Sequence, residues 1–193
     1  LRRRTAALWT IWFCVNLSYY GAFIWIPSLL VADGFSLVKS FSFTLIITLA
    51  QLPGYAVAAW LIELWGRRVT LAVFLLGSAA AAGLYGAAAT EALIILAGCL
   101  LSFFNLGAWG ALYAIGPDLY PTSLRGRGTG AAAGFGRLAS IAAPLIVPPL
   151  LAAGGTAWLF VVFAAAFANV SLYSPNVPEP SLSHTPRGYK IGT

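Results

Sequence analysis

Six long apolar runs, separated by short connections that carry most of the charge, limit what this chain can fold into more than any other feature. The runs cover roughly 8–30, 41–62, 69–89, 92–114, 128–151 and 156–173. Each approaches the ~20 helical residues that cross a hydrocarbon core of ~30 Å. Backbone groups in lipid must bond within their own segment, and these runs lack the alternation of strands, so they predict helices. The expected fold class is an all-α membrane protein with six transmembrane helices.

The composition supports a bilayer as the surrounding solvent. Of the 193 residues, 60% are hydrophobic and only 8% are charged, whereas a soluble domain carries about 25% charged residues. The net charge of +6 is compatible with nucleic-acid binding in principle. Because the arginines lie between the apolar runs, they favour loops beside a membrane instead, with the lipid bilayer and not a nucleic acid as partner.

The distribution of arginine predicts the orientation of the chain. Seven arginines occur before the first run, between the second and third, and between the fourth and fifth, whereas the opposite side carries only Lys39 beside Asp33 and Glu91. The positive-inside rule then places the N-terminus and the loops 63–68 and 117–127 in the cytoplasm. Six spans return the polar segment 174–193 to that side, where we expect a disordered tail. The predicted location is the cell (plasma) membrane.

The spans lack the residue clusters that catalysis or metal binding requires. The single histidine, His184, lies in the polar tail, and Cys14 and Cys99 lie inside apolar runs as small hydrophobic residues. The spans contain no Asp/Glu pair and no group with metal-ligand spacing. We therefore predict that the protein is not an enzyme, and that it has no catalytic residue, no metal site and no cofactor.

Arg137 is the one cation expected deep within a span. It lies ten residues beyond Arg127, or about 15 Å along a helix, and an arginine at that depth costs roughly 2.5–3.5 kcal/mol. One interpretation is a structural bond to backbone carbonyls or to Asn105. The other is recognition of an anionic substrate group, because the guanidinium fork matches a carboxylate.

Polar and aromatic side chains recur on one face of several spans. Asn105, Trp109 and Tyr113 are spaced by one turn, as are residues of the first and second spans. Either they pack helices together, or they line a cavity suited to a small planar ligand. Together with Arg137 they form the predicted substrate-binding set, which consists of Asn16, Tyr19, Tyr20, Gln51, Asn105, Trp109, Tyr113 and Arg137.

Two loops carry most of the remaining charge. The first, Glu63 to Arg68, contains Gly66, which permits a tight turn. The second runs from Gly116 to Gly128, and in it Asp118 could pair with Arg125 or Arg127. Each loop is either a topology anchor or a charge latch of a cytoplasmic gate. After the second loop, the spacing of Gly130 and Gly134 favours close helix approach, and kinks are expected at Pro144 and Pro148-Pro149.

These motifs together resemble the second half of a major facilitator superfamily transporter. The segment IELWGRR is similar to the D/E-x-x-G-R-R/K loop motif of that family, and PDLYPTSLRGRGTG is similar to its E-x-Y-P-T-x-x-R-x-x-G motif. Asp118 stands where many relatives have Glu, so the carboxylate is kept. The segments AQLPGYAVAAWLIELWGRR, LLSFFNLGAWGALYA and AAAGFGRLASIAAP resemble more closely the metabolite:proton symporters of niacin-transporter type.

The resemblance implies half of a 12-helix fold that works by alternating access. It implies a gating role for Glu63, Gly66, Arg67, Arg68, Asp118, Arg125 and Arg127. It also implies a small organic acid or aromatic metabolite, such as a nicotinate-like compound, as substrate and protons as the coupling ion. The chain begins with Leu1, so we expect a fragment whose N-terminal six-helix half is missing. The alternatives are a non-transporting membrane protein or assembly partner, and a sugar- or cation-type transporter of the same superfamily.

Overall fold

The computed structural model describes residues 2–32 and 34–171, and this described part is helical with no strand. Asp33 and the predicted tail 174–193 lie outside it. The elements in chain order are α1 (Arg2–Phe23), α2 (Ile26–Ala32), α3 (Leu37–Leu49), α4 (Gln51–Trp65), α5 (Arg67–Gly86), α6 (Glu91–Ile115), the 3₁₀ turn η1 (Gly116–Leu119) and α7 (Arg125–Ser171).

The lengths of the helices in the described part of the chain fit six membrane crossings. Four stretches are long and apolar enough to cross: Leu37–Trp65, which joins α3 and α4, Arg67–Gly86, Glu91–Leu119 and Arg125–Asn169. A fifth is formed by α1 with α2, which are bent by 42° relative to each other. The last stretch, Arg125–Asn169, has 45 residues, or about 68 Å as one helix, which is more than twice the hydrocarbon thickness. It is also interrupted by non-helical backbone at Gly154 and Gly155. Because α7 therefore crosses twice, the expected all-α fold with six spans is confirmed.

Local sequence explains where the helices break. Pro53 has no N–H for the Leu49 carbonyl, and α3 ends at Leu49 before α4 begins. Gly66 has a φ of 81° between α4 and α5, and Gly155 has a φ of 68° at the reversal within α7, a region of backbone space that favours glycine. By contrast, the backbone stays helical through Pro144, Pro148 and Pro149. The prolines at which kinks were expected therefore do not end the helix.

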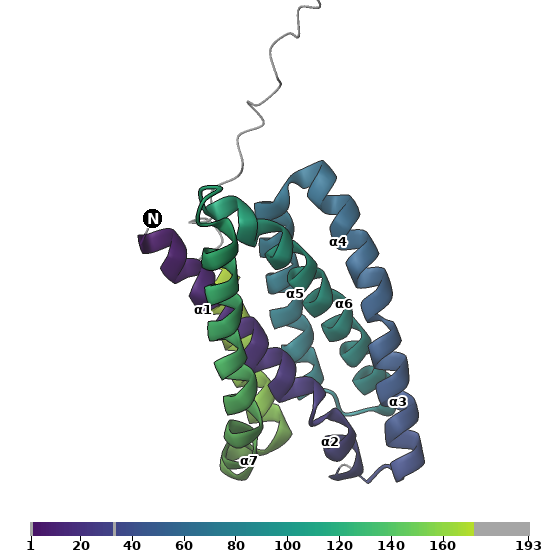
Figure 1. The fold of residues 1–193 in the computed structure, drawn as a ribbon. Helices are drawn as coiled ribbons and strands as arrows, with labels where there is room; N and C mark the ends of the chain where they lie inside the picture. Colours follow the sequence, from purple (N-terminus) through teal and green to yellow (C-terminus); the bar gives the residue numbers. More distant parts are fainter. Residues whose placement is uncertain (1, 33, 172–193) are drawn as a thin grey trace, which may run out of the picture.

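The helices pack as a single bundle in which α1 lies along the first half of α7, as Figure 1 shows, and α5 packs between α6 and α7. Small residues bring the helices close together. A Cβ on Gly54 of α4 would collide with the Phe103 carbonyl of α6. The start of α1, the α4–α5 turn and the α6–α7 loop lie at the same end of the molecule (Figure 1). We call this the arginine-bearing end, after Arg67, Arg68, Arg125 and Arg127.

Candidate functional site

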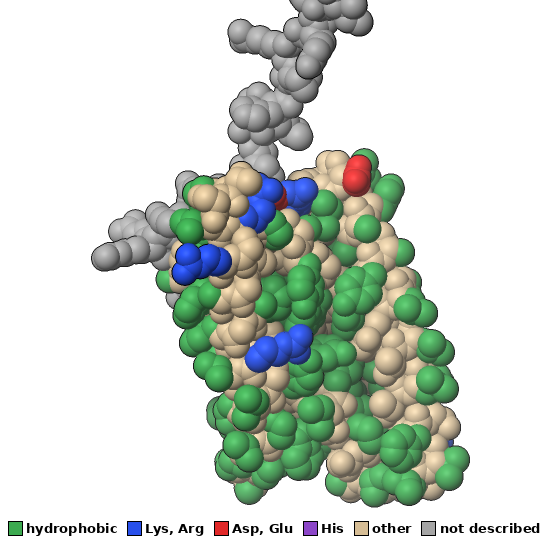
Figure 2. Space-filling model, in the orientation of Figure 1, with side chains coloured by type: hydrophobic (Ala, Val, Ile, Leu, Met, Phe, Trp, Pro, Cys, Tyr) green, Lys and Arg blue, Asp and Glu red, His purple; other side chains and the backbone are tan. Residues whose placement is uncertain are grey.

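Arg137 lies in the first half of α7 and binds a side chain of α1. Its Nη1 donates a hydrogen bond of 2.8 Å to the Tyr20 hydroxyl, and Arg137 makes no ion pair with any carboxylate in the described residues. Figure 2 shows basic side chains gathered at the upper end of the molecule, with a separate basic patch about halfway down an otherwise apolar face. A guanidinium without a counter-charge at this depth is able to bind an anion.

Aromatic rings from α1 and α6 lie next to this arginine. Tyr20 meets Tyr19 edge to face at 5.3 Å between ring centroids, and Tyr19 meets Trp109 at 5.9 Å. Trp12 joins the group through Trp109 at 5.6 Å and Tyr113 at 5.0 Å. These distances are typical of favourable ring pairs. The result is an apolar wall with hydroxyl groups, next to a cation.

The second span contributes Gln51, at the start of α4. Its side chain lies close to the Tyr19 hydroxyl. Tyr113 remains 49% exposed, and Tyr55 of α4 is 43% exposed. Both rings are therefore accessible from outside the bundle, as a ligand-contacting surface requires.

Two predicted site residues are buried, and they differ in their bonding. Asn16 is 0% exposed, donates to the Trp12 carbonyl of its own helix at 2.7 Å and accepts from the Ser140 hydroxyl at 3.0 Å. Asn105 is 1% exposed, and neither its amide nitrogen nor its amide oxygen has a partner among the described residues. Asn105 was one of the partners considered for Arg137, but among the described residues Arg137 donates to the Tyr20 hydroxyl and Asn105 has no bond to it.

The arginine-bearing end joins the two loop motifs directly. Arg67, in the first turn of α5, forms an ion pair with Asp118 of η1. The predicted pairing of Asp118 with Arg125 or Arg127 is therefore wrong, and Glu63 has no ion-pair partner within the described ranges. The reason is geometric, because Asp118 lies in the 3₁₀ turn that follows α6 and its partner Arg67 lies directly after the α4–α5 turn.

Side-chain packing also fixes the position of the α6–α7 loop. Tyr120 is only 7% exposed, and a Cβ on Gly128 would lie 2.7 Å from three atoms of its ring. The Tyr120 hydroxyl reaches the Thr5 hydroxyl of α1 at 3.5 Å. A missing side chain at Gly128 thus allows the loop to pack against both α7 and α1.

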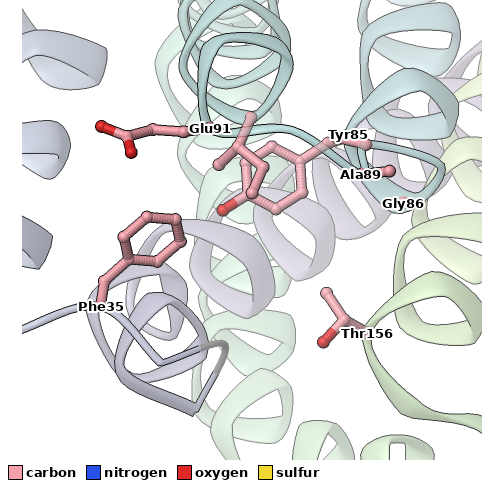
Figure 3. A pocket seen from close by; sticks show the side chains of 8 residues that line it. Phe35, Tyr85, Gly86, Ala89, Glu91 and Thr156 are labelled. Carbon is pink, nitrogen blue, oxygen red and sulfur yellow. The ribbon is translucent and has the colours of Figure 1, made fainter.

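A separate hollow lies at the opposite end of the bundle. Its volume is about 300 Å³, and Figure 3 shows Phe35, Tyr85, Glu91 and Thr156 reaching it from different elements. The Glu91 carboxylate is bound by Lys39 Nζ at 2.7 Å. None of the predicted substrate-binding residues lines this hollow, so it is a feature distinct from the Arg137 region.

Sequence reasoning missed two residues that build the Arg137 region. Trp12 joins the ring group, and Ser140 binds Asn16. Gly136 belongs to the glycine series in which close helix approach was expected, and it allows α7 to lie on the Trp12 carbonyl of α1. A signal was available, since Trp12, Asn16 and Tyr20 are one turn apart on α1. The partner positions on α7 could not be identified without the relative register of the two helices.

Comparison with known proteins places these features in a family context. Residues 1–174 match the protein family described as sugar (and other) transporter. The chain is 53% identical over 150 residues to a Bacillus subtilis protein named NiaP for niacin/nicotinamide transport, covering 78% of this chain and 38% of that protein. It is 48% identical over 170 residues to the niacin transporter NiaP of Acinetobacter baylyi, covering 88% of this chain and 39% of that protein.

The fold is matched by a solved structure. The crystal structure of FucP, a major facilitator superfamily transporter in the outward conformation, superimposes with a TM-score of 0.73 at 18% identity. The match covers 92% of this chain and 43% of FucP. The chain therefore spans about two fifths of the length of the curated relatives it matches.

Proposed function

Because this chain belongs to the sugar (and other) transporter family and has the fold of the major facilitator superfamily, we propose that it is the C-terminal half of a transporter for a small aromatic carboxylate. The substrate class is nicotinate-like, and transport is proton-coupled and proceeds by alternating access. The observation that carries this proposal is Arg137, which within residues 2–32 and 34–171 has the Tyr20 hydroxyl and no carboxylate as its partner, beside a group of aromatic rings.

The chemistry of the Arg137 region matches that substrate class. A planar ring would pack against Tyr19, Trp109 or Tyr113, while its carboxylate would accept hydrogen bonds from the guanidinium fork. The neutral Tyr20 hydroxyl is a weaker partner for Arg137 than a carboxylate, so an incoming anion would compete for the same donors. The niacin transporter of Acinetobacter, at 48% identity, supports the choice of a pyridine carboxylate as probe.

Alternating access and proton coupling need groups that the described residues do not supply. Two six-helix halves form the family's alternating-access unit, so the proposal includes a preceding half that supplies the other wall of the cavity. Within the described spans the carboxylates lie only at helix ends, and we assign the titratable group for proton coupling to that other half. The arginine-bearing end would face the cytoplasm of a cell with the protein in its plasma membrane.

The ion pair at that end fits a role in gating. Arg67 and Asp118 come from different loops, so they would hold α5 and η1 together in one conformation and release them in another. Gly66 would supply the turn that brings Arg67 into place. Glu63, Arg68, Arg125 and Arg127 would supply further charges on the same surface, for contact with the preceding half.

An uptake assay tests the proposal. The chain would be expressed alone and also joined to the N-terminal part of the Acinetobacter niacin transporter, and we call the second form the fusion transporter. We expect saturable uptake of labelled nicotinate by the fusion transporter, driven by an inward proton gradient, and none by the chain alone. Flux through the chain alone would show that six helices suffice, and absence of uptake by both forms would contradict the proposed function.

Arg137→Lys tests the binding role within that assay. Lysine keeps the charge but loses the bidentate fork, so nicotinate uptake should fall about tenfold at unchanged membrane expression. Lys39→Arg, a same-charge exchange at the opposite end, is the matched control and should leave uptake unchanged. Normal uptake by Arg137→Lys would remove Arg137 from the binding site.

A further inference from the structure

The contact between α1 and the first half of α7 contains two polar bonds in register. In the first, the Ser140 hydroxyl donates to Asn16 Oδ1 at 3.0 Å. In the second, Arg137 donates to the Tyr20 hydroxyl at 2.8 Å. Asn16 and Tyr20 are one helical turn apart on α1, as Arg137 and Ser140 are on α7. The pairs are therefore adjacent steps of one helix–helix contact.

The first of these bonds is buried, and the second is open to the outside. Asn16 is 0% exposed, and its amide nitrogen is engaged by the Trp12 carbonyl at 2.7 Å. Its oxygen accepts the Ser140 hydroxyl, and because Asn16 is fully buried it is not accessible to a substrate. Arg137 is exposed. The two neighbouring bonds are thus suited to different roles. The buried Asn16–Ser140 bond can fix the two helices, and the exposed Arg137 can contact a ligand.

Because α1 and α7 pack closely around the buried Asn16–Ser140 bond, this bond can form in only one register of the two helices. A Cβ on Gly136 would lie 2.9 Å from Asn16 Nδ2 and 3.1 Å from the Trp12 carbonyl oxygen. The α7 backbone therefore rests directly on the Asn16 amide, and two turns earlier on α1 Trp9 stacks with Phe135 at 4.9 Å between ring centroids. A slide or rotation of α7 would break the Asn16–Ser140 bond and displace Arg137 from Tyr20 in the same movement.

We propose that Asn16 is a positioning residue, which through Ser140 and Gly136 fixes the register of α7 on α1 and so holds the Arg137 guanidinium in place for an anion. Asn16 does this without contacting the substrate. The anion-binding part of this inference rests on the proposed function, whereas the coupling between the two bonds does not. Ser140 is the residue of choice for testing it, because its removal leaves Asn16, Arg137 and Tyr20 in the chain.

The first test separates binding from turnover in the fusion transporter. Ser140→Ala should raise the KM for nicotinate about fivefold with Vmax and expression unchanged, since an interhelical bond of this kind contributes modestly. The KM for nicotinamide, a neutral molecule of the same shape, should change less than about twofold. Ser140→Thr retains the hydroxyl and should restore the KM for nicotinate. Ser78→Ala is the matched control, because the buried Ser78 hydroxyl donates to the Phe74 carbonyl of its own helix and, among the described residues, to no other helix.

Equal changes in KM for both compounds, or no change for either, would overturn the positioning role. If the unsubstituted fusion transporter takes up neither compound, the proposed function fails, and a second measurement still decides the positioning role. In the purified chain, the loss of Tm caused by Tyr20→Phe should be smaller in a Ser140→Ala background than in the original sequence, because Arg137 is already displaced. Strictly additive losses of Tm would overturn the inference.

Discussion

The arginine-bearing end and the contact between α1 and α7 both place an arginine opposite a residue far away in sequence, but they treat its charge differently. At the end of the molecule Arg67 meets the carboxylate of Asp118. In the middle of the span Arg137 meets the hydroxyl of Tyr20 and, in the part of the chain that the structure describes, no carboxylate. A compensated charge holds two segments together, whereas an uncompensated charge in a membrane keeps its capacity for an anion. The difference separates a structural or gating role from a binding role.

The largest effect should come from supplying the missing counter-charge in the middle of the span. Tyr20→Glu places a carboxylate opposite Arg137, which makes this site resemble the Arg67–Asp118 pair. The new carboxylate would occupy the guanidinium, and nicotinate uptake by the fusion transporter should fall on the order of 100-fold, as expected for a close charge pair. Nicotinamide uptake, measured in parallel, should fall far less.

Tyr20→Phe is the control for that substitution, because it removes the hydroxyl without adding charge. It should change nicotinate uptake less than about fivefold, the scale of one interhelical hydrogen bond. If Tyr20→Glu leaves nicotinate uptake intact, the uncompensated state of Arg137 has no functional importance, and the contrast between the two regions collapses.

The second effect concerns shape at the arginine-bearing end. In Gly128→Ala the new Cβ would lie 2.7 Å from the Tyr120 ring, so the loop must move, at a cost of about 1–3 kcal/mol. Gly130→Ala is the matched control, because no atom lies within 4 Å of its added Cβ, and it should stabilise the helix by up to about 1 kcal/mol. Thermal unfolding of the purified chain measures the stability of both variants, and equal Tm values for Gly128→Ala and Gly130→Ala would contradict packing of Tyr120 on Gly128.

The contrast also shows how far the sequence could predict this molecule. The six crossings follow from apolar runs, and the break between the last two follows from a glycine pair that local chemistry makes recognisable. The partners of Asp118 and Arg137 did not follow. Periodicity states which residues share a face of one helix, but not how that helix is rotated and shifted against its neighbour. For Asp118 the sequence offered only the arginines of its own loop as partners. For Arg137 it offered backbone carbonyls, Asn105 or an anionic substrate group, and Tyr20 was not among them.

Burial was equally hard to predict from pattern alone. Asn16 and Tyr20 are one turn apart on α1, yet Asn16 is fully buried against Gly136 and Tyr20 is only partly buried beside Arg137. Gly136 on the facing helix lets the α7 backbone pack directly over Asn16, and the pattern of α1 does not reveal this. The predicted substrate-binding set stays a prediction as a whole, and the structure supplies a specific geometric reason to test each member separately.

A smaller effect is expected when the compensated pair is broken. Asp118→Asn leaves Arg67 without its partner, and both side chains are partly exposed, at 36% and 26%, so the pair is worth at most about 1 kcal/mol. If it biases the equilibrium between two transporter conformations, Vmax for nicotinate should change up to about fivefold, with KM unaltered. The exchange Arg67→Asp with Asp118→Arg should recover Vmax, and failure to recover would mean that the individual residues, and not the pair, matter.

The smallest effect should occur at the opposite end, where Lys39 and Glu91 form the other ion pair found in the described part of the chain. Their side chains are 45% and 44% exposed, more than those of Arg67 and Asp118, and water and salt screen such pairs strongly. Lys39→Gln should therefore lower the stability of the purified chain by less than about 1 kcal/mol, and the loss should vanish in about 1 M salt, where the Debye length is about 3 Å. Because Lys39 joins α3 to α6, which already pack through Ile47 and Gly98, Vmax and KM for nicotinate should remain unchanged. A change in Vmax as large as that of Asp118→Asn would mean that compensated pairs at both ends control transport, and that charge compensation alone does not distinguish the arginine-bearing end.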